Sequence, residues 1–160
     1  MTRGAHLANA ISLAPQVLQA CWKARHTKQL QRARTIDVTR MAGWLSLEPE
    51  QLAAVRWEDV HAGTTSRSRL LVDYRDASVN LPRRFFVKTT AATFSTRVFG
   101  NLFGLGRNEV NFYRAVRPRL EVPAPQVFHV DGSDEDFLLL LEDLADRGCE
   151  FADITTRCDV

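Results

Sequence analysis

Hydrophobic and polar residues follow one another along the chain in a pattern that predicts five strands. Residues 85–88 form a short apolar run that ends on a charge, and residues 137–141 are apolar without a break, as in a strand buried on both faces. The other expected strands cover residues 55–60, 70–74 and 126–130. Because strand side chains point alternately to two faces, Phe86 and Lys88 should share one face of their strand and their neighbours the other.

Helical spacing of apolar residues is found in the N-terminal part of the chain. Residues 7–34 predict one or two helices, in which Pro15 is acceptable if it falls in a first turn. The apolar positions at helical intervals in this segment are Ile11, Ala14, Leu18, Cys21 and Trp22. Thr35 or Asp37 can cap a further short helix. Its expected inner face consists of Val38, Met41 and Leu45.

Two further helices are expected between the third and fourth strands. Residues 94–103 predict a short amphipathic helix, and residues 108–117 predict another, which Pro118 should end. In the second of these helices Glu109 is followed at helical spacing by Phe112, Tyr113 and Val116. The same phase that buries these apolar residues turns Glu109 inward.

A carboxylate on an apolar helix face is costly unless a partner neutralises it. Lys88 is the expected partner of Glu109, because the helix should cover the strand that carries Lys88. Each residue also has a plainer interpretation. Lys88 can be a lysine at a strand end whose ammonium reaches solvent, and Glu109 can be an acid favoured by the helix dipole.

The segment at residues 61–69 reads as a polar loop between the first two strands. It contains Gly63, several hydroxyl side chains, and the bases Arg67 and Arg69. Backbone N–H groups of such a turn can hold phosphate oxygens, although small polar hairpin loops are common in proteins of every kind.

Composition and charge restrict the class of protein. With 160 residues, 45% hydrophobic and 25% charged, the chain matches one soluble globular domain. The formal net charge is +2, but residues 1–40 are strongly basic and contain a single acid, Asp37. We interpret this basic segment as a solvated helix face and expect neither a nucleic-acid nor a membrane partner.

The cysteines and the hydropathy pattern indicate a cytoplasmic protein. Cys21, Cys149 and Cys158 are odd in number and lack the spacing of a metal site, so reduced thiols are expected. No apolar run reaches the ~18 residues of a membrane span, and the N-terminal segment lacks the apolar core of a secretory signal.

Several motifs together resemble a known family. In chain order they are Gly63-Thr64-Thr65-Ser66-Arg67, Phe86-Val87-Lys88, Glu109-Val110-Asn111-Phe112-Tyr113, Pro123-Ala124-Pro125 and Leu139-Leu140-Leu141-Glu142-Asp143-Leu144. This succession resembles the N-terminal lobe of the aminoglycoside phosphotransferase and choline kinase-like superfamily, and among its branches the ecdysteroid-kinase-like (CHK-type) phosphotransferases. The resemblance covers about residues 36–150.

The resemblance implies an α+β fold of the protein-kinase-like N-lobe type. Such a lobe has an antiparallel sheet of about five strands and one main helix. Residues 36–160 would form it, up to and just past the hinge between lobes, and residues 1–35 would be a basic helical extension.

The resemblance also implies a nucleotide site. Lys88, held by Glu109, would present its ammonium to the phosphates, as kinases do with a strand lysine and a helix glutamate. The loop residues over the nucleotide would be Gly63, Thr64, Thr65, Ser66 and Arg67. The hinge that reads the base would consist of Leu141, Glu142, Asp143 and Leu144. Phe86 stands where protein kinases usually have a small residue, so its ring would either pack on a purine or fill the core.

The implied activity is ATP-dependent phosphorylation of a hydroxyl group on a small molecule of unknown identity. The family places its catalytic His-Gly-Asp loop and a downstream Asn after the hinge, whereas here the last histidine is His129 and the last asparagine Asn111. We therefore expect no catalytic residue in this chain, Mg²⁺ binding only in a complete two-lobed protein, and an inactive N-terminal fragment or a lobe completed from elsewhere. The alternatives are a non-catalytic nucleotide-binding or protein-interaction module and a basic helical scaffold for an acidic partner.

A lone N-lobe should leave the apolar side chains of its cleft in water. Phe86, Leu141 and Leu144 would lose the cover of the nucleotide and of a second lobe, at roughly 1.5–3 kcal/mol for each large side chain. We therefore expect a chain of marginal stability that self-associates through this surface, unless residues 11–22 fold over it.

Overall fold

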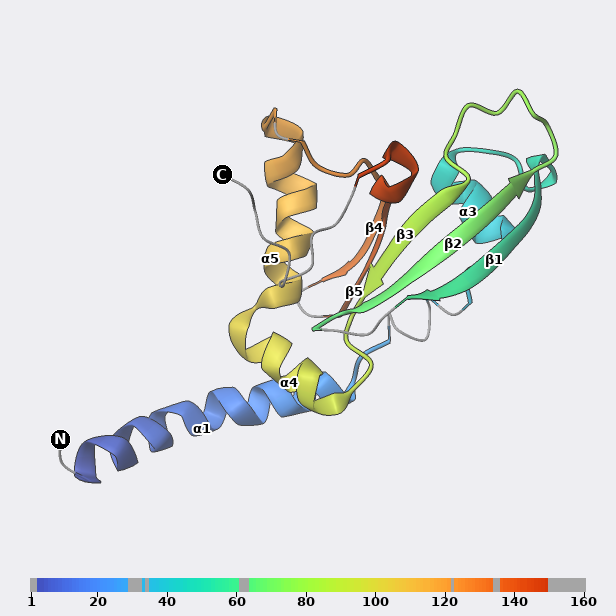
Figure 1. Ribbon diagram of the computed structural model, residues 1–160. Helices are drawn as coiled ribbons and strands as arrows, with labels where there is room; N and C mark the ends of the chain where they lie inside the picture. The colour runs from blue at the N-terminus through green and yellow to red at the C-terminus, as the bar shows by residue number, and fades with distance from the viewer. Residues whose placement is uncertain are drawn as a thin grey trace.

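The computed structural model describes residues 3–28, 33, 35–60, 64–121, 123–133 and 136–149, and the fold is α+β (Figure 1). One five-stranded antiparallel sheet has the order β1-β2-β3-β5-β4. Its strands are β1 (Leu52–Val60), β2 (Ser66–Tyr74), β3 (Arg84–Thr89), β4 (Val127–Ser133) and β5 (Asp136–Glu142). The described helices are α1 (Arg3–Arg25), α3 (Val38–Leu45), α4 (Phe94–Phe103) and α5 (Leu105–Asn111).

All five expected strands are present, but β2 is longer than its apolar residues indicate. It begins at Ser66, so residues 66–69 are paired strand and not part of the loop. Arg67 pairs with Val60 of β1 on one side and with Lys88 of β3 on the other. Pairing on both sides satisfies the backbone of this polar stretch, and this outweighs its low apolar content.

One face of the sheet is closed by α3. Phe85 and Val87 of β3 point to this face and are fully buried with Met41 and Ala42 of α3. Of the two expected caps, Asp37 is the N-cap of α3, and its Oδ1 accepts a hydrogen bond from the Arg40 backbone N–H at 2.9 Å. This face, which we call the closed face, holds the larger of the two hydrophobic clusters.

The opposite face, which we call the open face, is only partly covered by α5. Val110 packs there with Phe137, Leu139 and Leu141, and Phe86 lies partly buried at the edge of the cluster. The expected alternation along β3 is thereby confirmed.

The helix that carries Glu109 differs from its expected form. After α5 the chain continues as a π-helical turn (Phe112–Val116) and a 3₁₀ turn (Arg117–Arg119), so Pro118 does not end the helical segment. Pro118 lies at the start of the 3₁₀ turn, where a missing N–H costs little. The wide π turn shifts the helical phase, and Val116 is 42% exposed and not buried as predicted.

Helix α1 begins at Arg3, so Pro15 lies inside it and not in its first turn. It packs on α4 through Ala20 and Ala24, whose carbonyls accept hydrogen bonds from Asn101 Nδ2 and Arg97 Nε, both at 2.8 Å. Leu18 and Trp22, on the predicted apolar face, are 71% and 63% exposed.

Figure 1 shows α1 running beneath α4 and extending beyond it, away from the strands. The described part of α1 therefore does not cover the open face, so the exception allowed for residues 11–22 is not met. Among the described residues, no helix is long and apolar enough to cross a membrane.

Candidate functional site

An open pocket of about 500 Å³ lies on the open face of the sheet. β2 and β3 contribute Arg67, Arg69, Phe86 and Lys88 to its wall, and Glu109 of α5 and Tyr113 of the π turn lie beside them. The remaining lining residues are Pro125 and the end of β5 with the two residues after it: Leu141, Glu142, Asp143 and Leu144.

The pairing of residues across β2, β3 and β5 places different side chains at the two ends of the pocket. At one end Arg67 of β2 lies directly across from Lys88 of β3. At the other, Arg69, Phe86 and Leu141 form one row across β2, β3 and β5. The rows are two residues apart along each strand, which corresponds to about 7 Å. The pocket therefore has a cationic end and an end that combines one arginine with apolar walls.

Lys88 and Glu109 form the ion pair that the sequence predicts. Lys88 Nζ lies 2.5 Å from Glu109 Oε1, and the two side chains are only 21% and 20% exposed. Lys88 is therefore not a lysine whose ammonium simply reaches solvent, and Glu109 lies outside the first turn of α5, where the helix dipole would favour an acid. The carboxylate has a second effect nearby, because burial, and to a smaller extent Glu109, raise the pKa of Tyr113.

The other end of the pocket contains an ion pair that sequence reasoning did not find. Arg69 Nε lies 2.5 Å from Asp143 Oδ2, and Asp143 is almost completely buried. The second carboxylate oxygen of Asp143 accepts a hydrogen bond from the Ala145 backbone N–H at 3.1 Å and so caps the short 3₁₀ helix Leu144–Arg147. Asp143 thus joins β2 to the chain that leaves the sheet.

Glu142 is held in a similar way. Its Oε2 accepts a hydrogen bond from the Gln126 backbone N–H at 3.1 Å, and its Oε1 is paired with Arg147. The Glu142 backbone N–H in turn donates to the Gln126 carbonyl at 2.9 Å. Each oxygen of both carboxylates therefore has a partner, and these contacts tie the segment to β2, to the Gln126 backbone and to Arg147.

Leu141 corrects one expectation about the cleft. Although it lines the pocket, it is 3% exposed and packs with Val110 and Phe137, so it is not an apolar side chain left in water. Phe86 combines both roles that the sequence left open, because it packs against the same cluster and also lines the pocket.

The structure brings most of the predicted site residues together, but not the loop residues. Arg67, Phe86, Lys88, Glu109 and Leu141 to Leu144 line the pocket. Gly63 lies outside the described residues. Ser66 is the first residue of β2 and is not among the residues lining the pocket.

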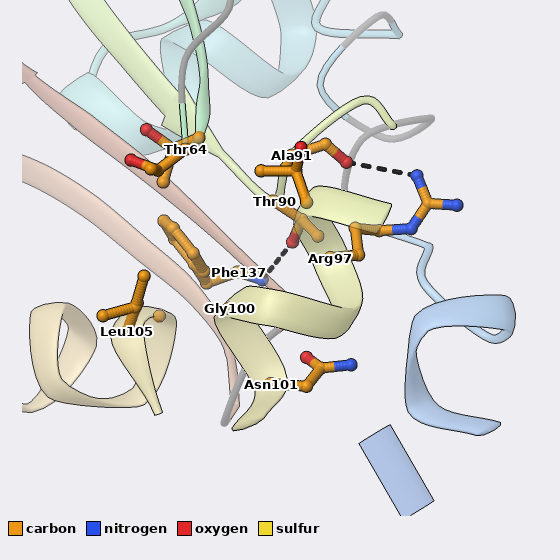
Figure 2. Close-up of a pocket in the computed structure, with 11 residues that line it drawn as sticks. Thr64, Thr90, Ala91, Arg97, Gly100, Asn101, Leu105 and Phe137 are labelled. Atoms are coloured by element: carbon orange, nitrogen blue, oxygen red, sulfur yellow. Dashed lines mark hydrogen bonds between the residues drawn. The ribbon is translucent and has the colours of Figure 1, made fainter. Parts of the chain in front are cut away.

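Thr64 and Thr65 line a separate small cavity of about 20 Å³, bounded by α4, Leu105 and Phe137. Figure 2 shows Thr64 above Thr90 and Phe137, with Gly100 and Asn101 of α4 below. Thr90 Oγ1 accepts a hydrogen bond from the Phe137 backbone N–H at 3.1 Å, whereas the buried Thr65 Oγ1 has no hydrogen-bond partner among the described residues. The cavity has room for about one water molecule.

Arg69, Tyr113 and Pro125 are lining residues that the sequence interpretation missed. Arg69 was placed in a loop, but a strand that starts at Ser66 puts Arg67 and Arg69 on the same face, two residues apart. Tyr113 follows Glu109 by four residues on the helical segment, and that spacing was the available signal.

The three cationic side chains of the pocket differ in whether they have a carboxylate partner. Lys88 and Arg69 each have a carboxylate partner, whereas Arg67 is exposed and forms no ion pair within the part of the chain that the structure describes. In that same part no group of three His, Cys, Asp or Glu side chains is arranged to hold a metal ion. Cys21 and Cys149 are free thiols.

Comparison of the chain with protein-family models, with curated proteins and with solved structures finds no match.

Proposed function

We propose that the pocket binds a purine nucleoside triphosphate, with its phosphates at the Arg67–Lys88 end and its base at the Arg69–Phe86 end. In this proposal the chain is the nucleotide-binding lobe of a small-molecule phosphotransferase of the aminoglycoside phosphotransferase and choline kinase-like kind. The observation that carries it is the Lys88–Glu109 ion pair, formed between strand and helix at the edge of an open pocket.

Electrostatics supports phosphate at this end. Glu109 holds the Lys88 ammonium in place but occupies only part of its donor capacity, because an ammonium has three N–H groups. Arg67 lies directly across the strand pair and adds a second cation. Two positively charged side chains beside one carboxylate leave a net positive site, which suits an anionic ligand.

The side chains at the Arg69–Phe86 end of the pocket suit the binding of a planar ring. Phe86 and Leu144 offer apolar surface, and Leu141, Tyr113 and Pro125 line the same pocket. Aromatic and apolar walls with few fixed polar groups are typical of small-molecule sites.

Phosphoryl transfer also needs a group that orients the acceptor hydroxyl and metal ions near the transferred phosphate. The proposal assigns neither role to a residue of the pocket, whose residues bind and orient the nucleotide. Lys88 and Arg67 would donate hydrogen bonds to phosphate oxygens, and Glu109 would position Lys88.

Calorimetric titration with ATP and with GTP tests the proposal for the wild-type chain and two lysine variants. Lys88→Met should weaken binding of both nucleotides at least tenfold, because hydrogen bonds to charged groups contribute about 1.5–3 kcal/mol each. Lys28→Met is the matched control, since it removes the same charge from an exposed residue that does not line the pocket. Glu109→Gln should weaken binding less than Lys88→Met, because the ammonium remains.

The proposal would be wrong if the wild-type chain bound neither nucleotide at millimolar concentration. It would equally be wrong if Lys88→Met and Lys28→Met had the same affinity as the wild type.

A further inference from the structure

We call the Arg69–Phe86 end of the pocket the base end. Arg69 is a charged side chain at this end whose hydrogen-bonding capacity is not used up. Its Nε is bonded to Asp143 Oδ2, but neither terminal nitrogen of the guanidinium has a hydrogen bond or ion pair with any described residue. The side chain is 32% exposed and lines the pocket in one row with Phe86 and Leu141. Arg69 therefore presents N–H donors to whatever occupies this end.

Each carboxylate oxygen at the same end already has a partner. Asp143 accepts from Arg69 through one carboxylate oxygen and from the Ala145 backbone through the other. Glu142 is engaged through both of its oxygens, by Arg147 and by the Gln126 backbone. The charged side chains of the base end consequently offer donors to a ligand and no unoccupied carboxylate oxygen.

Purine bases differ in the hydrogen-bond donors and acceptors that they present to such a surface. Guanine and hypoxanthine present two adjacent acceptors, O6 and N7, whereas adenine presents the N7 acceptor beside the N6 amino donor. A guanidinium can donate to O6 and N7 together, which is a strong and geometrically specific contact. Against adenine one of its N–H groups would face another donor.

We propose that the base end of the pocket selects a 6-oxopurine, guanine or hypoxanthine, over adenine, and that Arg69 is the residue that determines this preference. The inference rests on the proposed function, because it names the class of nucleotide that the same pocket takes. A bidentate contact of this kind discriminates between bases by roughly five- to 150-fold, equivalent to about 1–3 kcal/mol.

The first test needs no variant. Dissociation constants of the wild-type chain are measured by calorimetry for GTP, ITP and ATP under the same conditions. GTP and ITP should bind about equally and at least fivefold more tightly than ATP, because both carry O6 and N7. Tighter binding of ATP, or equal binding of all three, would overturn the inference. A preference for GTP that ITP does not share would also overturn it, since that preference would come from the guanine 2-amino group and not from contact with O6.

The second test removes the donors. Arg69→Met should reduce the GTP-to-ATP ratio to about one, and Arg69→Lys, which keeps the charge without the planar fork, should reduce it in part. Arg84→Met is the matched control, because Arg84 also bridges a strand to the 3₁₀ helix after β5, through Asp146 at 3.4 Å, but does not line the pocket. It should leave the ratio unchanged. An unchanged ratio in Arg69→Met, or an equal fall in Arg84→Met, would contradict the role of Arg69.

The two proposals fail in different ways. If the wild-type chain binds nucleotides and Lys88→Met weakens that binding, the site stands even when the ratio of GTP to ATP affinity refutes the inference. If no nucleotide binds at all, the proposed function fails, and the inference fails with it.

Discussion

The two faces of the sheet are built by the same strands but differ in burial and in charge. On the closed face Phe85 and Val87 are completely buried under α3 in a cluster without charged members. On the open face the intervening residues, Phe86 and Lys88, are only partly buried, and the pocket beside them carries three ion-paired or free cations. Within one six-residue strand, Phe85 and Val87 thus support the core, and Phe86 and Lys88 line the pocket.

The difference shows how a small domain separates stability from recognition. Alternation of side chains means that a substitution at one position of β3 affects one face and leaves the other nearly intact. The closed face should therefore determine the free energy of unfolding, and the open face should determine ligand affinity. Measurements on neighbouring residues can test this separation directly.

The largest effect is expected from truncating the two adjacent phenylalanines of β3. Phe85→Ala should lower the free energy of unfolding by about 3–5 kcal/mol, because it leaves a cavity in a closed core. Phe86→Ala should cost less than half as much, since its ring already borders an open pocket. Urea denaturation of both variants measures the difference. Equal losses would show that the open face contributes to stability as much as the closed face does.

A second comparison uses the only two tyrosines of the chain, one on each face. Burial, opposed by Arg83, raises the pKa of Tyr74 to about 12, and its hydroxyl donates to the Pro82 carbonyl at 2.7 Å. Burial and Glu109 also raise the pKa of Tyr113. Ultraviolet titration should therefore show neither phenol ionising at its ordinary pKa near 10.

The sign of the stability effect follows from the direction of the shift. A phenol whose folded pKa lies above its unfolded pKa stabilises the fold fully below about pH 10 and loses that contribution as the pH rises toward 12. Tyr74→Phe should remove most of this alkaline dependence, whereas a ligand in the pocket should alter the titration of Tyr113 alone. A ligand that shifted Tyr74 instead would contradict the separation of the two faces.

The smallest effect is expected at His129 of β4, whose ring stacks on Trp44 of α3 on the closed side at 4.3 Å between centroids. Burial lowers the pKa of His129, with the Asp131 carboxylate opposing it. A histidine that folds neutral contributes stability fully above its unfolded pKa of about 6.5 and loses it as the pH falls below that value. Denaturation at pH 7.5 and pH 5.5 should thus show a modest acid loss in the wild type, and His129→Gln should reduce it. A variant with the full acid loss would exclude His129 as its source.

Hydrophobic periodicity was sufficient to predict the five strands, the alternation along β3 and the Lys88–Glu109 pair. These features depend on short-range pattern and on which helix covers which strand. The start of β2 was not predictable in this way, because Ser66 to Arg69 are polar and are held in the sheet by pairing with β1 on one side and with β3, later in the chain, on the other. The Arg69–Asp143 pair was missed for the same reason, since its residues are 74 positions apart.

The helical errors have a different physical origin. A helical wheel assumes a constant 3.6 residues per turn, and the π turn after Asn111 breaks that assumption just where Val116 was assigned to the interior. In α1 the large apolar residues indicated one inner face, but close packing on α4 uses the small residues Ala20 and Ala24 instead. Pattern alone does not distinguish a face packed through small side chains from one packed through large ones.

The double engagement of Asp143 has a mechanical consequence for the chain that leaves the sheet. One carboxylate fixes β2, the end of β5 and the start of the following 3₁₀ helix to one another, so these elements should move as a single rigid piece. Gly148, with φ of +71°, is the next position where the backbone takes a conformation open mainly to glycine. Gly148 lies a full helical turn after Leu144 of the pocket, so a change of backbone conformation at Gly148 should leave the shape of the pocket unchanged.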